Sequence, residues 1–131
     1  MPYLLDTNIW IALSKGEREA TLRLRGFASD QVRSCAIVWA ELMYGANKSN
    51  RIKETTQGFE QLLERFVSLP FNDEAGAAYG RLRAHLERLG TPVGHNDLQI
   101  ASIALANDCV VVTRNEREFR RIPGLRVESW A

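Results

Sequence analysis

The sequence predicts an α/β sandwich built around a central parallel sheet. Short apolar or β-branched runs alternate with longer segments whose apolar residues recur at helical spacing. Strands that alternate with helices pair in parallel, and the helices cover the faces of the sheet. The clearest strand candidate, 110–113, is β-branched throughout. With 131 residues and 45% hydrophobic content, the chain suits a single domain, 1–131, with one core.

The first half of the chain is expected to contain three strands and four helices. Two segments show helical spacing of apolar residues, one through Ala20, Leu22, Leu24 and Phe27, and the other through Ile52, Phe59, Leu62, Leu63 and Phe66. In chain order we expect a strand at 3–5, helices at 7–14 and 17–27, a strand at 31–35, helices at 36–46 and 51–66, and a strand at 67–69.

The second half is expected to hold two long helices, a short helical turn and two strands. Asp73 is interpreted as the N-cap of the first long helix, and Gly90 follows its end. A Thr-Pro-Val-Gly loop at 91–94 separates the two long helices. The elements are helices at 73–89 and 95–107, a strand at 110–113, a helical turn at 117–121 and a strand near 125–128.

Composition narrows the class of protein. The chain has 17 basic and 16 acidic residues, so no strong overall charge attracts it to nucleic acid or to a membrane. No apolar run is long enough to span a bilayer, and no basic segment followed by an apolar one marks a signal peptide. We expect a cytoplasmic protein without membrane contact. Cys35 and Cys109 lie in apolar runs and are expected to be reduced and buried.

Three acidic residues lie in unusually apolar surroundings. Asp6 follows the strand at 3–5, and the carboxyl ends of parallel strands are where sites gather. Glu41 has Ile37 and Val38 on its helix face, and Asp97 precedes Leu98-Gln99-Ile100-Ala101. Structural explanations remain open, because Asp6 and Asp97 can cap helices and Glu41 can pair with a buried arginine.

A fourth acid is less certain in its role. Glu118 precedes Phe119, an expected core residue, and can turn toward the other acids, whereas Glu116 is expected to pair with Arg120 at the surface. Carboxylates that converge repel one another unless a cation joins them, and hard divalent ions such as Mg²⁺ or Mn²⁺ prefer oxygen ligands. Such a site suits phosphodiester hydrolysis.

Three segments together resemble the PIN-domain ribonucleases, above all the VapC toxins of bacterial VapBC toxin–antitoxin modules. They are Leu4-Leu5-Asp6-Thr7-Asn8-Ile9, Ala40-Glu41-Leu42-Met43-Tyr44-Gly45 and Thr91-Pro92-Val93-Gly94-His95-Asn96-Asp97-Leu98-Gln99-Ile100-Ala101. The match continues through 113–119 and the tail at 124–130, so it covers essentially the whole chain. The resemblance implies a PIN-like α/β/α sandwich.

The resemblance also implies a Mg²⁺-dependent endoribonuclease, with Mn²⁺ as a substitute. It assigns metal-binding and catalytic roles to Asp6, Glu41 and Asp97, and it extends a catalytic role to Glu118. Asn115 stands where the family often has an aspartate. The polar residues expected to support the site are Thr7, Asn8, Thr113 and Asn115.

The same resemblance implies partners for this chain. They are an RNA substrate, with initiator tRNA cut in its anticodon stem-loop as one candidate, a VapB-type antitoxin that covers the site, and a second copy in a homodimer. DNA is contacted only through the antitoxin. Arg114 and Arg117 are candidate RNA contacts, with a solvated face of ion pairs as the alternative.

Two other functions fit parts of the sequence. In the first, Asp6 is the covalent nucleophile of a phosphohydrolase, but such enzymes usually carry a second aspartate two residues on, where this chain has Asn8. In the second, the acids are only helix caps, and residues such as Trp10 and Leu22 form a partner groove in a non-catalytic domain.

Overall fold

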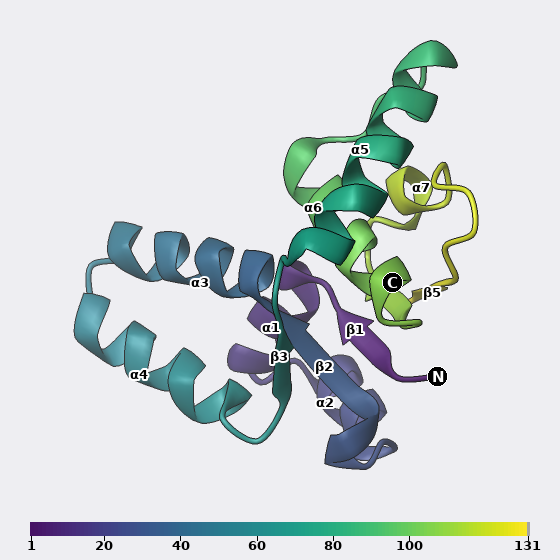
Figure 1. Cartoon of the computed structure of the whole chain (residues 1–131). Helices are drawn as coiled ribbons and strands as arrows, with labels where there is room; N and C mark the ends of the chain where they lie inside the picture. The colour runs from purple at the N-terminus through teal and green to yellow at the C-terminus, as the bar shows by residue number, and fades with distance from the viewer. Residues whose placement is uncertain (131) are drawn as a thin grey trace.

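The computed structural model describes residues 1–130 and contains a five-stranded sheet in the order β3-β2-β1-β4-β5 (Figure 1). Every neighbouring pair of strands is parallel. The strands are β1 Tyr3–Leu5, β2 Val32–Cys35, β3 Val67–Leu69, β4 Val110–Thr113 and β5 Val127–Ser129. Helices flank the sheet, which confirms the predicted α/β fold with a central parallel sheet.

Helices connect successive strands in nearly the predicted order. They are α1 Thr7–Ser14, α2 Arg18–Arg25, α3 Ala36–Lys48, α4 Ile52–Leu63, α5 Asp73–Arg88, α6 His95–Ala106 and α7 Glu116–Phe119, with a 3₁₀ turn at Ser29–Gln31. The predicted N-cap of α5 is wrong by one residue, because Oδ1 of Asn72 accepts the Ala75 N–H at 3.0 Å. Gly90 follows α5 with a φ of +71°, as its capping role requires.

The largest side chain of the core is Trp10, which is fully buried. Its indole Nε1–H donates to the Leu5 carbonyl at 3.0 Å, and its ring packs against Phe66 with centroids 5.2 Å apart. Because both contacts are internal, they fix α1 against the end of β1. Leu22 behaves differently and is 53% exposed on α2. Cys35 and Cys109 are buried and free, as predicted.

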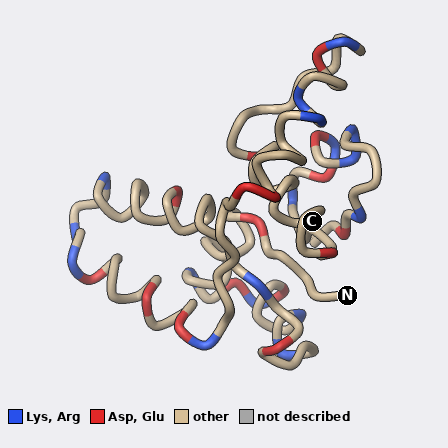
Figure 2. The backbone as a smooth tube through the Cα atoms, viewed as in Figure 1, with Lys and Arg blue, Asp and Glu red and all other residues tan. Residues whose placement is uncertain are grey.

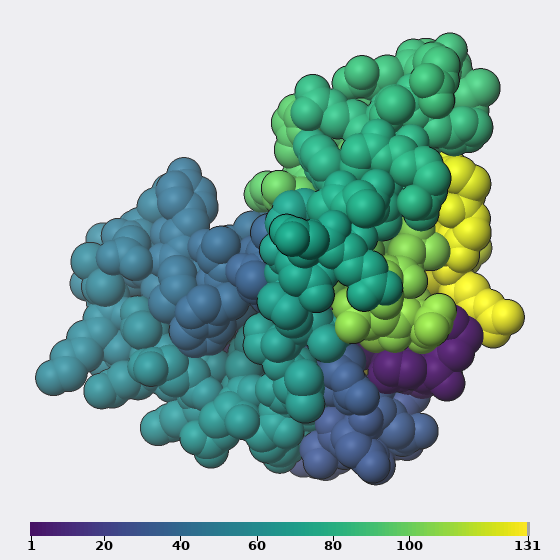
Figure 3. Space-filling view, viewed as in Figure 1, coloured from purple at the N-terminus to yellow at the C-terminus, as the bar shows by residue number. Residues whose placement is uncertain are grey.

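Two pairs of helices project from the sheet and leave a notch between them. The α3–α4 pair lies on one side and the α5–α6 pair on the other (Figures 1 and 3). The start of α3 meets α1 and α6 near the base of this notch. The connection between α5 and α6, and the first turn of α6, lie on the notch side of their pair. The arrangement brings residues that are distant in sequence to one region.

Acidic and basic positions are interspersed along the backbone trace (Figure 2). Within residues 1–130, no helix is long and apolar enough to cross a membrane.

Candidate active site

Asp6 lies at the junction between the central strand β1 and helix α1 and is only 4% exposed. Oδ1 accepts the Thr7 N–H at 2.7 Å, so the residue does cap α1. Oδ2 accepts the hydroxyl of Thr113, at the end of β4, at 2.9 Å. Burial has the largest effect on Asp6 and raises its pKa. The two hydrogen bonds lower the pKa, and the negative charges of Glu41 and Glu118 raise it. Asp6 therefore caps α1 and is also an acid whose surroundings disfavour its ionised form.

Glu41 reaches the same region from helix α3. Its Oε1 accepts the Thr7 hydroxyl at 2.8 Å, so Thr7 binds Asp6 through its backbone and Glu41 through its side chain. The alternative role, as the partner of a buried arginine, finds no support among the described residues, where no ion pair includes Glu41. Glu41 is half-buried and faces Asp6.

Asp97 is the third residue of α6, and the N-cap position of that helix is Gly94. Capping therefore does not explain Asp97. Burial is the largest cause that raises the pKa of Asp97 to about 7. Hydrogen bonding to Glu118 and the charges of Asp6, Glu118 and Glu41 act in the same direction. Because the other three acids all affect the ionisation of Asp97, the four belong to one site.

Glu118 is brought to Asp97 by the short helix α7. Oε1 accepts the backbone N–H of Gly94 at 2.9 Å, and Oε2 accepts Nδ2–H of Asn115 at 3.0 Å. The Gly94 bond is the main cause that lowers the pKa of Glu118. Glu116 instead pairs with Arg120 at 2.9 Å, as the sequence predicts. The Gly94 N–H is a site group that sequence reasoning missed, because no side-chain pattern reports a backbone donor.

Neutral polar side chains lie between the acids. Nδ2 of Asn115 also lies 3.4 Å from Oδ2 of Asp97, and its backbone N–H donates to the Thr113 hydroxyl at 2.8 Å. Thr113 and Asn115 thus join the Asp6 half of the site to the Asp97 half. Asn8 is exposed on α1 and has no hydrogen bond to the four acids within the described part of the chain.

The two candidate RNA-binding arginines differ in their surroundings. Arg114 follows β4 and makes two hydrogen bonds to Glu17, with distances of 2.8 and 3.3 Å. This ion pair lowers the pKa of Glu17. Arg117 lies on α7, one residue before Glu118, and is exposed. Both arginines flank the acids without contacting them.

The donor set fits a hard divalent cation in its chemistry. Carboxylate oxygens are the ligands that Mg²⁺ and Mn²⁺ prefer, and a cation would relieve the repulsion that, after burial, raises the pKa values of Asp6 and Asp97. In the side-chain positions described for residues 1–130, no three His, Cys, Asp or Glu groups form a site that could hold one ion.

Comparison with known proteins gives the same assignment as the geometry. The family model of the PIN domain matches residues 3–125. Ribonuclease VapC2 of Rickettsia felis is 38% identical over 132 residues, covering 99% of this chain and 98% of the relative. The chain belongs to the VapC family of PIN-domain ribonucleases. The tRNA(fMet)-specific endonuclease VapC of Salmonella typhimurium is 37% identical, with coverage of 99% and 98%.

Solved VapC-family structures share the whole fold. The VapBC2 structure from Rickettsia felis, bound to a promoter DNA fragment, superposes with a TM-score of 0.94 at 36% identity and covers 100% of both chains. The DNA-bound VapBC structure from Salmonella typhimurium gives the same TM-score and identity, with coverage of 100% and 99%. These likenesses confirm the VapC family, the fold and the ribonuclease class that the sequence predicts.

Proposed function

We propose that this VapC-family chain is the toxin of a type II toxin–antitoxin module and acts as a divalent-metal-dependent endoribonuclease. The observation that carries the proposal is that four acids from separate elements meet in one region, where burial, and to a lesser extent the neighbouring negative charges, raise the pKa values of Asp6 and Asp97. Carboxylates arranged in this way favour cation binding over a purely structural role.

Asp6 and Asp97 are the proposed metal ligands, and Glu41 binds the ion through water or orients the attacking water. Glu118 is the proposed fourth acid, held by Gly94 and Asn115. A bound Mg²⁺ or Mn²⁺ would lower the pKa of its own water and stabilise negative charge on the phosphate. Thr7 and Thr113 fix the carboxyl groups of Glu41 and Asp6 through their hydroxyls. Hydrolysis by this route leaves a 3′-hydroxyl and a 5′-phosphate.

RNA is the proposed substrate, and it enters the notch between the α3–α4 and α5–α6 pairs. The acids come from both sides of this notch, because Glu41 lies on α3 and Asp97 on α6. Arg114 and Arg117 are the proposed phosphate contacts beside these acids. The anticodon stem-loop of initiator tRNA is the first substrate to test, since the Salmonella relative is named for tRNA(fMet).

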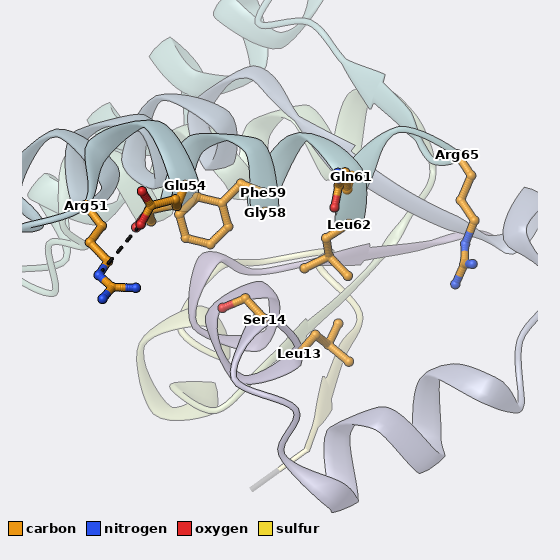
Figure 4. A pocket seen from close by; sticks show the side chains of 10 residues that line it. Leu13, Ser14, Arg51, Glu54, Gly58, Phe59, Gln61, Leu62 and Arg65 are labelled. Atoms are coloured by element: carbon orange, nitrogen blue, oxygen red, sulfur yellow. Dashed lines mark ion pairs between the residues drawn. The ribbon is translucent and has the colours of Figure 1, made fainter.

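A VapB-type antitoxin is the proposed protein partner, because the Rickettsia and Salmonella relatives are solved as VapBC complexes. We assign it a groove of about 780 Å³ between the end of α1 and helix α4 (Figure 4). Leu13, Phe59 and Leu62 supply apolar surface, while Arg51 and Arg65 are charged residues around it. Apolar surface with a polar rim is typical of a protein interface.

Two further proposals concern assembly and location. The toxin forms a homodimer, which light scattering will test. It reaches DNA only through its antitoxin, which gel-shift assays with and without the antitoxin will test. It acts in the cytoplasm, as expected for an enzyme whose substrate is tRNA. Loss of the dimer at micromolar concentration, or DNA binding by the toxin alone, contradicts these proposals.

The deciding experiment compares Asp6→Asn with a matched control, Asp30→Asn, at an exposed residue outside the site. Asparagine caps helices as well as aspartate does, so α1 is retained. We expect Asp6→Asn to lose cleavage of tRNA(fMet) and inhibition of growth, while Asp30→Asn keeps both. Isothermal titration with Mn²⁺ should show a site in the control only. Full activity of the Asp6→Asn variant overturns the proposed function.

A further inference from the structure

A chain of hydrogen bonds runs along helix α5 and ends on the first residue of α6. Glu87 accepts from Nε–H of Arg83 at 3.1 Å. Nη1 of Arg83 donates to the hydroxyl oxygen of Tyr79 at 3.3 Å, and that hydroxyl lies 2.9 Å from Nδ1 of His95. The Tyr79 ring is held edge-on by Phe71, with centroids 6.0 Å apart. Nothing in the proposed chemistry has yet used this chain.

The donors along this chain favour one arrangement of protons at His95. A guanidinium only donates, so Tyr79 accepts from Arg83, and its own hydroxyl hydrogen is available for Nδ1 of His95. In that arrangement Nδ1 is an acceptor, and the proton of the neutral ring sits on Nε2. A charged imidazolium also carries a proton on Nε2. In either form Nε2–H is a donor, and it has no partner within residues 1–130.

The position of His95 sets what this donor can reach. The residue is exposed, begins α6, follows Gly94 and lies two positions before Asp97. Successive helix positions differ by about 100°, so His95 and Asp97 face different directions from the same turn. The first turn of α6, which carries both residues, lies on the notch side of its helix pair (Figures 1 and 3). A chain of nucleotides that reaches Asp97 through the notch therefore passes the turn that carries His95.

We propose that Nε2–H of His95 donates to a phosphate oxygen of the RNA next to the bond that is cut, and that Tyr79 is a positioning residue that holds the ring for this contact. The inference rests on the proposed ribonuclease function. A neutral donor at this place attracts a phosphate that the neighbouring acids repel, and the amino end of α6 also favours an anion. Contacts to phosphate fix the register of a nucleic acid.

Kinetics of four variants test the contact, with a synthetic RNA hairpin of the tRNA(fMet) anticodon arm as substrate. His95→Phe keeps a flat ring but removes the donor, and Tyr79→Phe removes only the hydroxyl. We expect His95→Phe to raise KM about three- to tenfold, the value of one hydrogen bond, while kcat stays within about twofold. Tyr79→Phe should raise KM less, and His95→Gln, which keeps an N–H donor, should recover part of the loss.

Matched controls separate this effect from folding or general packing. His85→Phe lies on the exposed face of the same helix α5, and Tyr44→Phe is an exposed tyrosine on α3. Both should leave KM unchanged. Because Tyr79 acts through His95, the double variant Tyr79→Phe/His95→Phe should have the KM of His95→Phe alone. Thermal unfolding checks that every variant is folded.

A substrate series identifies the group that is contacted. Single methylphosphonate replacements along the hairpin remove one charged phosphate oxygen at a time. We expect one replacement beside the cut to raise KM for the wild type and not for His95→Phe. An unchanged KM for His95→Phe, as a stacking role of the ring predicts, or the absence of such coupling, overturns the inference. If the wild type with Mg²⁺ cuts no RNA, the proposed function fails first and this contact with it.

Discussion

The hydroxyl of Thr113 donates a hydrogen bond of 2.9 Å to Oδ2 of Asp6, joining the ends of the adjacent strands β4 and β1. Both residues are buried, so the bond operates away from water. It is one of the two hydrogen bonds that favour the ionised form of Asp6 against the effect of burial. Thr113 therefore favours the ionised form of Asp6 and opposes the effect of burial on its pKa.

Thr113→Val tests this relationship because valine keeps the shape and loses the hydroxyl. It leaves a buried carboxylate oxygen without its donor, so we expect the free energy of unfolding to fall by about 1–3 kcal/mol in urea titrations at pH 7. Mn²⁺ should also bind more weakly, because Asp6 holds its proton more tightly. The control, Thr21→Val, removes a hydroxyl bonded to a backbone carbonyl on α2 and should leave Mn²⁺ affinity unchanged. Equal Mn²⁺ affinity in Thr113→Val and wild type argues against the role.

The raised pKa of Asp97 predicts that the free energy of unfolding of the metal-free protein depends on pH. Its pKa of about 7 in the folded state lies above the ordinary value of about 3.9 in the unfolded chain. The folded state thus binds the proton more tightly, and this stabilising contribution is complete below pH 4 and lost as pH rises through 7. At pH 8 we expect Asp97→Asn to be more stable than wild type by about 1–2 kcal/mol, a value reduced for partial exposure.

The measurement is urea unfolding of both proteins in EDTA at pH 4 and pH 8. The free energies of unfolding of the two proteins should be nearly equal at pH 4, and that of the variant should be the larger at pH 8. Mg²⁺ binding by the wild type should instead tighten as pH rises through about 7, since Asp97 must lose its proton to bind the ion. A difference in stability that is independent of pH contradicts the assignment.

Asn115→Asp tests why an amide stands beside the acids. The change removes the donor to Asp97 and Glu118 and adds a negative charge between them. We expect the metal-free protein to melt at a lower temperature and the increase in Tm on adding Mn²⁺ to be larger than in wild type. Asn47→Asp, on the exposed part of α3, is the control and should show neither change. A smaller Mn²⁺-dependent increase would count against Asn115 as a spacer between carboxylates.

Breaking the ion pair between Arg114 and Glu17 is expected to change the KM for RNA while changing the stability of the fold little. The two side chains are 33% and 44% exposed, so breaking the pair should change the free energy of unfolding by less than about 1 kcal/mol. Glu17→Gln frees the guanidinium for RNA phosphate, and we expect a lower KM for RNA. Arg114→Gln should raise KM. Glu19→Gln on the same helix turn is the control, and a KM for Glu17→Gln equal to that of wild type argues against competition.

Much of the fold could be predicted because its signals are local. The β-branched run of β4 and the helical spacing in α4 each depend on a few neighbouring residues. The N-cap of α5 was misassigned because Asn72 and Asp73 are both good caps, and only the backbone angles decide between them. Helix α4 likewise ends at Leu63, three residues before the predicted end at residue 66, although the apolar spacing continues to Phe66.

The acids of the candidate site could be chosen from the sequence, but their connections could not. Asp6 and Asp97 stand out because each is an acid among apolar residues. The bridges through Thr7 and Asn115 join residues far apart in the chain and depend on side-chain geometry. The tyrosine that holds His95 was equally hidden, because Tyr79 and His95 are 16 residues apart on two helices.

The double role of Asp6 as helix cap and site acid limits how the toxin can be silenced by mutation. Most replacements remove the cap from α1 as well as the carboxylate, and a lost cap costs about 1 kcal/mol. Among the residues that cap helices well, asparagine alone also has the shape of aspartate. Cells selected to survive the toxin while retaining a folded, antitoxin-binding protein should therefore carry asparagine at this codon far more often than chance allows.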